Sequence, residues 1–122
     1  MVGLCQDCAG KDVLDFGCGT GYGAYELTQV TQSCHGVDIS AEAVSLCRSS
    51  YACNEITFSH IKPVEETPLP FADASFDVVV SNQVIEHVAD PDAYIKEARR
   101  VLKPSGIFYL VTPDRAKTFW HY

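Results

Sequence analysis

Positively charged residues are few in this sequence of 122 residues, with nine Lys and Arg against sixteen Asp and Glu and a formal net charge of −7. No cluster of Lys or Arg is present that would neutralise phosphate groups, so the sequence argues against binding to nucleic acid or to an anionic membrane. Apolar residues make up 47% of the chain, enough for one small core and not for two. We expect a single domain, residues 1–122, that acts on a small molecule.

Long apolar runs are missing as well. No segment reaches the length that spans a bilayer, and residues 1–10 lack the basic start and apolar stretch of a signal peptide. All six Cys lie in the first half of the chain, several of them where a small apolar residue would serve. Cys5 and Cys8 have the spacing of half a zinc site or of a redox dithiol, but no second pair follows. We therefore expect reduced thiols, no metal and a cytoplasmic protein.

What the sequence does contain is a regular alternation of short strands and helices. Apolar runs predict five strands, at residues 13–16, 34–38, 56–59, 76–81 and 107–112. Helices are predicted after the glycine loop that follows the first strand, after Ser40 and after Asp90, and the last two are N-cap residue types. This alternation is typical of an α/β fold with a mainly parallel sheet. Four cations mark the solvent side and C-terminal end of the last helix: Lys96, Arg99, Arg100 and Lys103.

The loop after the first strand carries Gly17, Gly19 and Gly21. Glycine at such a place lets a ligand approach the backbone, and amides at the start of the helix add hydrogen-bond donors. Asp38, at the end of the second strand, is placed to accept both hydroxyls of a ribose. A dinucleotide fingerprint needs its third glycine where Tyr22 stands, so the spacing argues against a pyrophosphate ligand.

Asp15 stands just before this loop and adds to the same argument. A carboxylate at the end of a strand repels a phosphate but attracts an ammonium or a sulfonium. Asp15 therefore suits a cationic amino-acid ligand better than a dinucleotide. A second interpretation, compatible with the first, is that Asp15 holds the loop amides.

Four segments, taken in order, resemble motifs of the class I S-adenosylmethionine-dependent methyltransferases. Within this class, the resemblance is to the methyltransferase type 11-like domain. The segments are residues 13–21, 36–40, 69–79 and 101–106, and together they lie within residues 11–113. The resemblance implies a Rossmann-like α/β fold with strand order 3-2-1-4-5 and flanking helices. It also implies S-adenosyl-L-methionine as the cofactor.

The resemblance further implies roles for individual residues. The methionine end of the cofactor would lie against residues of the first motif, namely Asp15, Gly17, Cys18, Gly19 and Gly21. Asp38 would bind the ribose hydroxyls, and Ile39 would pack against the adenine. The adenine amino group would be met by Glu65, with Glu66 beside it, and Asn82 would border the methyl group.

Residues 82–87 follow the fourth strand, where this family commonly borders the methyl group and the acceptor. In a subset of the family, Glu-x-x-Glu-His at this place holds a divalent metal, but Gln83 replaces the first acid here. His87 has two interpretations. It is a general base near an acceptor hydroxyl, since its ordinary pKa lies close to neutral, or it is a histidine that only packs or hydrogen-bonds at a helix start.

The chain is shorter than the fold it resembles. The family normally continues past the fifth strand with another helix and a closing pair of antiparallel strands. We expect a cofactor-binding core that lacks this pair, so that the outer edge of residues 107–112 is unpaired and exposes Phe108, Tyr109 or Leu110. Such an edge favours self-association.

The function expected from these motifs is methyl transfer from S-adenosylmethionine to an unidentified small-molecule acceptor. Two alternatives stay open. One is a non-catalytic or incomplete cofactor-binding module that needs a partner or missing segments. The other is an NAD-dependent oxidoreductase, which should show the longer glycine spacing and a second nucleotide-binding half, and the sequence shows neither.

Overall fold

The computed structural model describes residues 8–51, 56–82, 84, 87–111 and 117–121. Six strands form one sheet in the order β3-β2-β1-β4-β5-β6. They are β1 (Asp12–Phe16), β2 (Ser33–Asp38), β3 (Ile56–His60), β4 (Phe76–Asn82), β5 (Leu102–Val111) and β6 (Lys117–His121). The first five strands pair in parallel, which confirms the predicted order 3-2-1-4-5.

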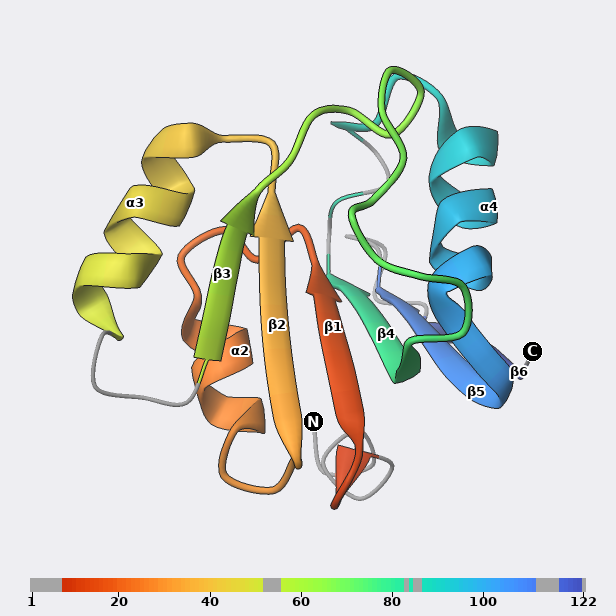
Figure 1. Ribbon diagram of the computed structural model, residues 1–122, viewed down its shortest axis with the longest axis horizontal. Helices are drawn as coiled ribbons and strands as arrows, with labels where there is room; N and C mark the ends of the chain where they lie inside the picture. Colours follow the sequence, from red (N-terminus) through yellow and green to blue (C-terminus); the bar gives the residue numbers. More distant parts are fainter. Residues whose placement is uncertain (1–7, 52–55, 83, 85–86, 112–116, 122) are drawn as a thin grey trace.

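Within the described residues, three helices cover the two faces of this sheet. They are α2 (Tyr22–Leu27), α3 (Ala41–Ser50) and α4 (Pro91–Val101). Figure 1 shows α3 beside β3 at one end of the sheet and α4 beside β4 and β5 at the other. Both predicted N-caps are confirmed, because Ser40 Oγ accepts a hydrogen bond from the amide of Ala43 and Asp90 Oδ1 accepts one from the amide of Ala93, each at 3.1 Å.

The central strands are buried on both faces, as expected for a parallel sheet between helices. Val78 and Val80 contribute to the core under α2 and α3, whereas Val79, between them, contributes to the core under α4. Since successive side chains of a strand point to opposite faces, an unbroken run of valines serves both cores at once. This packing fixes the position of the strand ends, where the candidate site lies.

The prediction that the outer edge of the fifth strand is unpaired is wrong. β6 pairs with β5 in antiparallel fashion, with Ile107 opposite His121 and Val111 opposite Lys117. The physical reason is that β6 supplies partners for the backbone groups along the outer side of β5. Phe108 is fully buried and Leu110 is 7% exposed, so these two side chains do not form the expected apolar edge. Self-association of the chain is not tested by this pairing and stays a prediction.

The fifth strand also begins earlier than predicted, at Leu102 rather than at Ile107. Its first part includes Pro104 and the left-handed Ser105, with a φ of 69°. The register between β4 and β5 shifts between Phe76 and Val78, so an irregular pairing accommodates these residues.

Cys8, Cys18, Cys34 and Cys47 are buried and form no disulfide, which confirms reduced thiols at these four positions. Burial raises the pKa of the Cys34 thiol to about 12, so that it stays protonated near neutral pH. Cys5, of the predicted Cys5 and Cys8 pair, lies outside the described residues.

In the part of the chain that the structure describes, no helix has the length and apolar character to cross a membrane.

Candidate functional site

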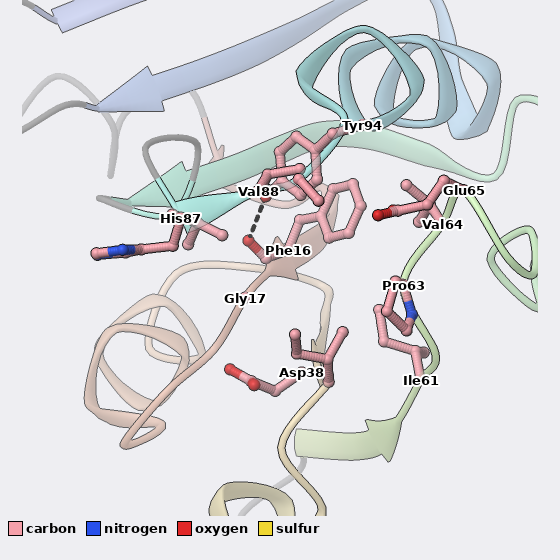
Figure 2. A pocket seen from close by; sticks show the side chains of 13 residues that line it. Phe16, Gly17, Asp38, Ile61, Pro63, Val64, Glu65, His87, Val88 and Tyr94 are labelled. Atoms are coloured by element: carbon pink, nitrogen blue, oxygen red, sulfur yellow. Dashed lines mark hydrogen bonds between the residues drawn. The ribbon is translucent and has the colours of Figure 1, made fainter.

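Two neighbouring cavities open at the carboxyl ends of β1, β2 and β4. The strand order changes direction between β1 and β4, and such a point is where open α/β sheets bind ligands. The first, which we call the apolar cavity, is lined by Phe16, Gly17, Asp38, Ile39, Ile61, Pro63, Val64, Glu65, Val84, His87, Val88, Ala89 and Tyr94 (Figure 2). The second, which we call the polar cavity, is lined by Asp15, Gly17, Cys18, Gly19, Thr20, Tyr22, Gly23, Glu26, Leu27, Val80 and Asn82.

Gly17 belongs to both cavities and must be glycine. Its φ of +94° lies in the left-handed region, and a Cβ atom at this position would come within 2.6 Å of a Val84 methyl group. The chain therefore passes close beneath Val84, where no side chain fits. This close approach leaves the backbone at Gly17 as part of the wall of both cavities.

The loop amides are used within the protein. Those of Gly17 and Cys18 both donate to the carbonyl oxygen of Val37, at 2.8 and 2.9 Å, and that of Gly21 donates to the carbonyl of Cys18. The amide of Gly19 donates to Asp38 Oδ2 at 2.9 Å. Each of these four loop amides already has an acceptor within the protein, whereas the donor role predicted for amides at the start of the helix stays a prediction.

Gly21 lines neither cavity. It is the N-cap of α2, with a φ of 84°, and a Cβ atom there would come within 2.9 Å of Cys47 Sγ and 3.0 Å of the Tyr51 ring. The structure therefore places Gly21 where the loop packs against α3. Gly19 and Cys18, in contrast, both line the polar cavity.

Asp15 is a buried carboxylic acid at the end of β1, with 5% of its surface exposed. Burial, and to a lesser degree the negative charge of Asp38, raise its pKa from 3.8 to about 7. A cation in the polar cavity would favour the ionised form and reverse this shift. Glu26, on the same cavity, adds a further negative charge that the sequence analysis missed. The signal was available, because Glu26 follows Tyr22 by four residues on α2 and so lies on the same face of the helix.

Asp38 ends β2 and is held from two directions. Its Oδ2 accepts the hydrogen bond from Gly19, and its Oδ1 accepts one from the amide of Ser40, also at 2.9 Å. A carboxylate has about four acceptor sites, so these two bonds fix its orientation and leave capacity for ligand hydroxyls. Asp38 lines the apolar cavity at the side that adjoins the glycine loop.

The predicted adenine contacts lie on the apolar cavity, with one exception. Ile39 is 59% exposed and lines this cavity. Glu65 lines it too, and Figure 2 shows its carboxylate turned toward Phe16. Glu66 is exposed and belongs to neither cavity lining. Asn82 lies at the end of β4 and lines the polar cavity.

Tyr94 and Phe16 form the floor of the apolar cavity, and the sequence analysis did not identify either as a site residue. The Tyr94 hydroxyl donates to the Phe16 carbonyl at 2.9 Å and lies 2.7 Å from Ser81 Oγ. The two rings stack with their centroids 4.0 Å apart. The only sequence signal for Tyr94 was its place on the apolar stripe of α4, which does not distinguish a floor residue from a core residue.

His87 lines the apolar cavity at the end opposite to Val64 and Glu65 (Figure 2). Its side chain is exposed, and its amide donates to the Val84 carbonyl at 2.9 Å. Gln83 and Glu86 occupy the positions of the two acids in the Glu-x-x-Glu-His metal motif, and both lie outside the described residues. Within the described ranges, no group of three or more His, Cys, Asp or Glu side chains is arranged to hold a metal ion.

The chain is similar to known proteins along most of its length. Residues 14–110 match the family described as methyltransferase domain. Over 112 residues the chain is 43% identical to a probable S-adenosylmethionine-dependent methyltransferase of Mycolicibacterium smegmatis, covering 92% of this chain and 42% of that protein. It is 36% identical over 110 residues to an arsenite methyltransferase of Aquipseudomonas alcaligenes, covering 82% of this chain and 32% of that protein.

A solved structure supports the same fold. The YcgJ protein of Bacillus subtilis superposes with a TM-score of 0.81 at 30% identity, over 92% of this chain and 48% of that one. The chain thus spans less than half the length of each of these three proteins.

Proposed function

The chain belongs to the methyltransferase domain family of S-adenosylmethionine-dependent enzymes, and on that basis we propose that its two cavities together bind S-adenosylmethionine for methyl transfer to a small molecule. The polar cavity would take the methionine end and the apolar cavity the adenosine end. Gly17, shared by both, would lie between them. We further propose that residues 1–122 act as one domain.

The observation that carries this proposal is the buried carboxyl group of Asp15. A group with a pKa of about 7, next to a second acid, is poorly suited to a phosphate ligand and well suited to an ammonium or sulfonium. Gly17, Cys18, Gly19 and Asn82 would complete the walls around the methionine end. The same charge argues against the NAD alternative, because a pyrophosphate would add negative charge beside Asp15.

The adenosine end would be held by three residues of the apolar cavity. Asp38, oriented by the amides of Gly19 and Ser40, would accept the ribose hydroxyls. Ile39 would cover one face of the adenine, and Glu65 would accept a hydrogen bond from its amino group.

Methyl transfer depends mainly on holding the donor methyl and the acceptor lone pair in line. The cofactor supplies a methyl group on a positively charged sulfur, which is already a strong electrophile. We propose that His87, at the end of the apolar cavity, accepts the proton that the acceptor loses.

A small-molecule acceptor is inferred because one relative acts, by its name, on arsenite. We also propose a cytoplasmic location, which the buried and reduced cysteines favour.

Calorimetric titration tests the binding proposal. S-adenosylhomocysteine should bind, and NAD should not. Replacement of Asp15 by Asn keeps the shape of the side chain and removes its charge, so it should weaken binding of S-adenosylhomocysteine. Binding of NAD alone would contradict the assignment.

The second candidate is a cofactor-binding module that is not catalytic by itself. The observation in its favour is that the chain spans less than half the length of its relatives. Turnover of the isolated chain with a panel of small acceptors separates the two. Binding of S-adenosylhomocysteine without any methyl transfer would favour the module.

A further inference from the structure

One wall of the apolar cavity comes from the long segment between β3 and β4, through Ile61, Pro63, Val64 and Glu65. In Figure 1 this segment leaves the end of β3, crosses to α4 and runs along that helix to the start of β4. Its first end is fixed, because the amide of Ile61 donates to the Asp38 carbonyl at 2.9 Å. We call residues 61–65 the wall.

The other end of the wall is fixed by α4 through Glu97. Glu97 Oε2 accepts a hydrogen bond from the amide of Leu69 at 2.7 Å. Arg100, one turn further along the helix, donates to Glu97 Oε1 at 2.6 Å and to its Oε2 at 2.9 Å. This pairing holds the pKa of Glu97 below its ordinary value, so the acceptor stays ionised.

Arg100 also binds the loop directly. Its Nη2 donates to the Leu69 carbonyl at 3.1 Å, and its Nη1 donates to the Phe71 carbonyl at 2.9 Å and to Asp73 Oδ1 at 2.7 Å. The prediction that Arg100 is a solvent-facing cation is wrong, because its side chain is only 28% exposed. A planar guanidinium with several donors reaches all of these acceptors together, which a lysine ammonium does not.

The distance along the chain from this anchor to the wall is short. Only residues 66–68 separate Glu65 from Leu69. Within that stretch the amides of Glu66 and Thr67 both donate to the Pro63 carbonyl, at 2.9 and 3.1 Å, so the wall leads into a closed turn. Movement of Leu69 would therefore displace the wall instead of being absorbed by an extended linker.

We propose that Arg100 and Glu97 are positioning residues for the cofactor: by holding both backbone groups of Leu69, they set the place of the wall and so the affinity for the adenosine half of the ligand. Neither residue lines the apolar cavity, and each acts through the loop. The inference rests on the proposed function, because it assigns the adenosine half to that cavity.

Two ligands and three variants test this role. S-adenosylhomocysteine and 5′-methylthioadenosine share the adenosine half, and only the first carries the amino-acid half. Arg100→Gln should weaken both by the same factor, roughly ten-fold, at a temperature where the variant is folded. Arg100→Lys should recover part of the loss. Arg99→Gln, on the same helix and outside both cavity linings, should leave both affinities unchanged.

Amide hydrogen exchange without ligand provides a second, independent measurement. In Arg100→Gln, exchange at Glu66, Thr67 and Leu69 should be faster, whereas exchange at Cys18 in the glycine loop should not change. A lower melting temperature with unchanged affinities would show that Arg100 only stabilises the fold, and it would overturn the proposal. Loss of affinity for S-adenosylhomocysteine alone would overturn it too.

The test also allows for a variant that does not fold and for a wild-type chain that binds neither ligand. If Arg100→Gln does not fold, Glu97→Gln takes its place, because it keeps an oxygen acceptor for Leu69 and loses only the charge; the same pattern is expected with a smaller factor. If the wild-type chain binds neither ligand, the proposed function fails. Exchange at Glu66 and Thr67 then decides the positioning role by itself, and unchanged exchange there would refute it.

Discussion

The polar and the apolar cavity are neighbours, but they are built in different ways. Most of the polar cavity comes from one continuous stretch, residues 15–27, with only Val80 and Asn82 added from β4. The apolar cavity collects its residues from the ends of β1 and β2, the segment before β4, the segment after β4 and α4. The first is therefore a local structure with a sequence signature, and the second depends on the position of distant segments.

The largest effect should come from the point where the two cavities meet. Gly17→Ala forces a Cβ atom to within 2.6 Å of Val84 at a left-handed φ, so the free energy of unfolding should fall by about 3 kcal/mol. Binding of S-adenosylhomocysteine should be lost. Gly19→Ala is the matched control, since its Cβ meets nothing within 4 Å and only the backbone strain of about 1 kcal/mol applies. Urea unfolding measures the free energy of unfolding of both variants. Equal losses of this free energy would show that the close approach of residue 17 to Val84 is not what makes Gly17→Ala costly.

The next effect concerns the residue that connects the loop with the apolar cavity. Asp38→Ala removes the acceptor for the amides of Gly19 and Ser40 and the proposed acceptor for the ribose hydroxyls. Affinity for S-adenosylhomocysteine should fall by about 1–3 kcal/mol. Calorimetry on the folded variant measures this. An unchanged dissociation constant would show that Asp38 serves only the turn.

A smaller effect is expected on the floor of the apolar cavity. Tyr94→Phe keeps the ring stacked on Phe16 but leaves the Phe16 carbonyl and Ser81 without the hydroxyl. The free energy of unfolding should fall by about 1–2 kcal/mol. Ser81→Ala loses only one of these bonds and should cost less. If thermal melts show no change for Tyr94→Phe, the hydroxyl does not hold the ends of β1 and β4 together.

Asp15 gives the stability of the chain a pH dependence. Its folded-state pKa of about 7 exceeds the ordinary 3.8, so between these values the folded form keeps a proton that the unfolded form releases. The contribution of Asp15 to the free energy of unfolding therefore decreases as pH rises from about 4 to about 7. Asp15→Asn should remove this decrease and make the ligand-free chain more stable at pH 8. A wild-type and a variant curve that run parallel would contradict the raised pKa.

The contrast between the cavities also explains what the sequence could predict. The glycine loop, Asp15 and Asp38 follow from neighbouring residues, because a strand, a turn and a helix N-terminus are adjacent along the chain. Tyr94 and Arg100 could not be identified in this way. Each lies on an amphipathic helix where the sequence indicates only an inner or an outer side, and their partners are the Phe16 carbonyl and the Leu69 and Phe71 carbonyls, many residues away.

Strand β6 was missed for a related reason. Residues 117–121 lie beyond the last recognisable motif, and a strand at the edge of a sheet is specified by pairing with its neighbour more than by its own pattern. The register that places Lys117 opposite Val111 depends on where β5 ends. Neither fact can be taken from a single segment of sequence.

In the proposed binding mode, the polar cavity recognises the charged amino-acid end of the cofactor and the apolar cavity recognises its adenosine. The most direct test is the pH dependence of binding for two ligands, measured by calorimetry between pH 6 and 8. Affinity for S-adenosylhomocysteine, which carries an ammonium group, should rise with pH as Asp15 ionises near pH 7, and affinity for 5′-methylthioadenosine, which lacks that group, should stay level. The rise should disappear in Asp15→Asn. A wild-type affinity for S-adenosylhomocysteine that is independent of pH, or the same rise for both ligands, would contradict this binding mode.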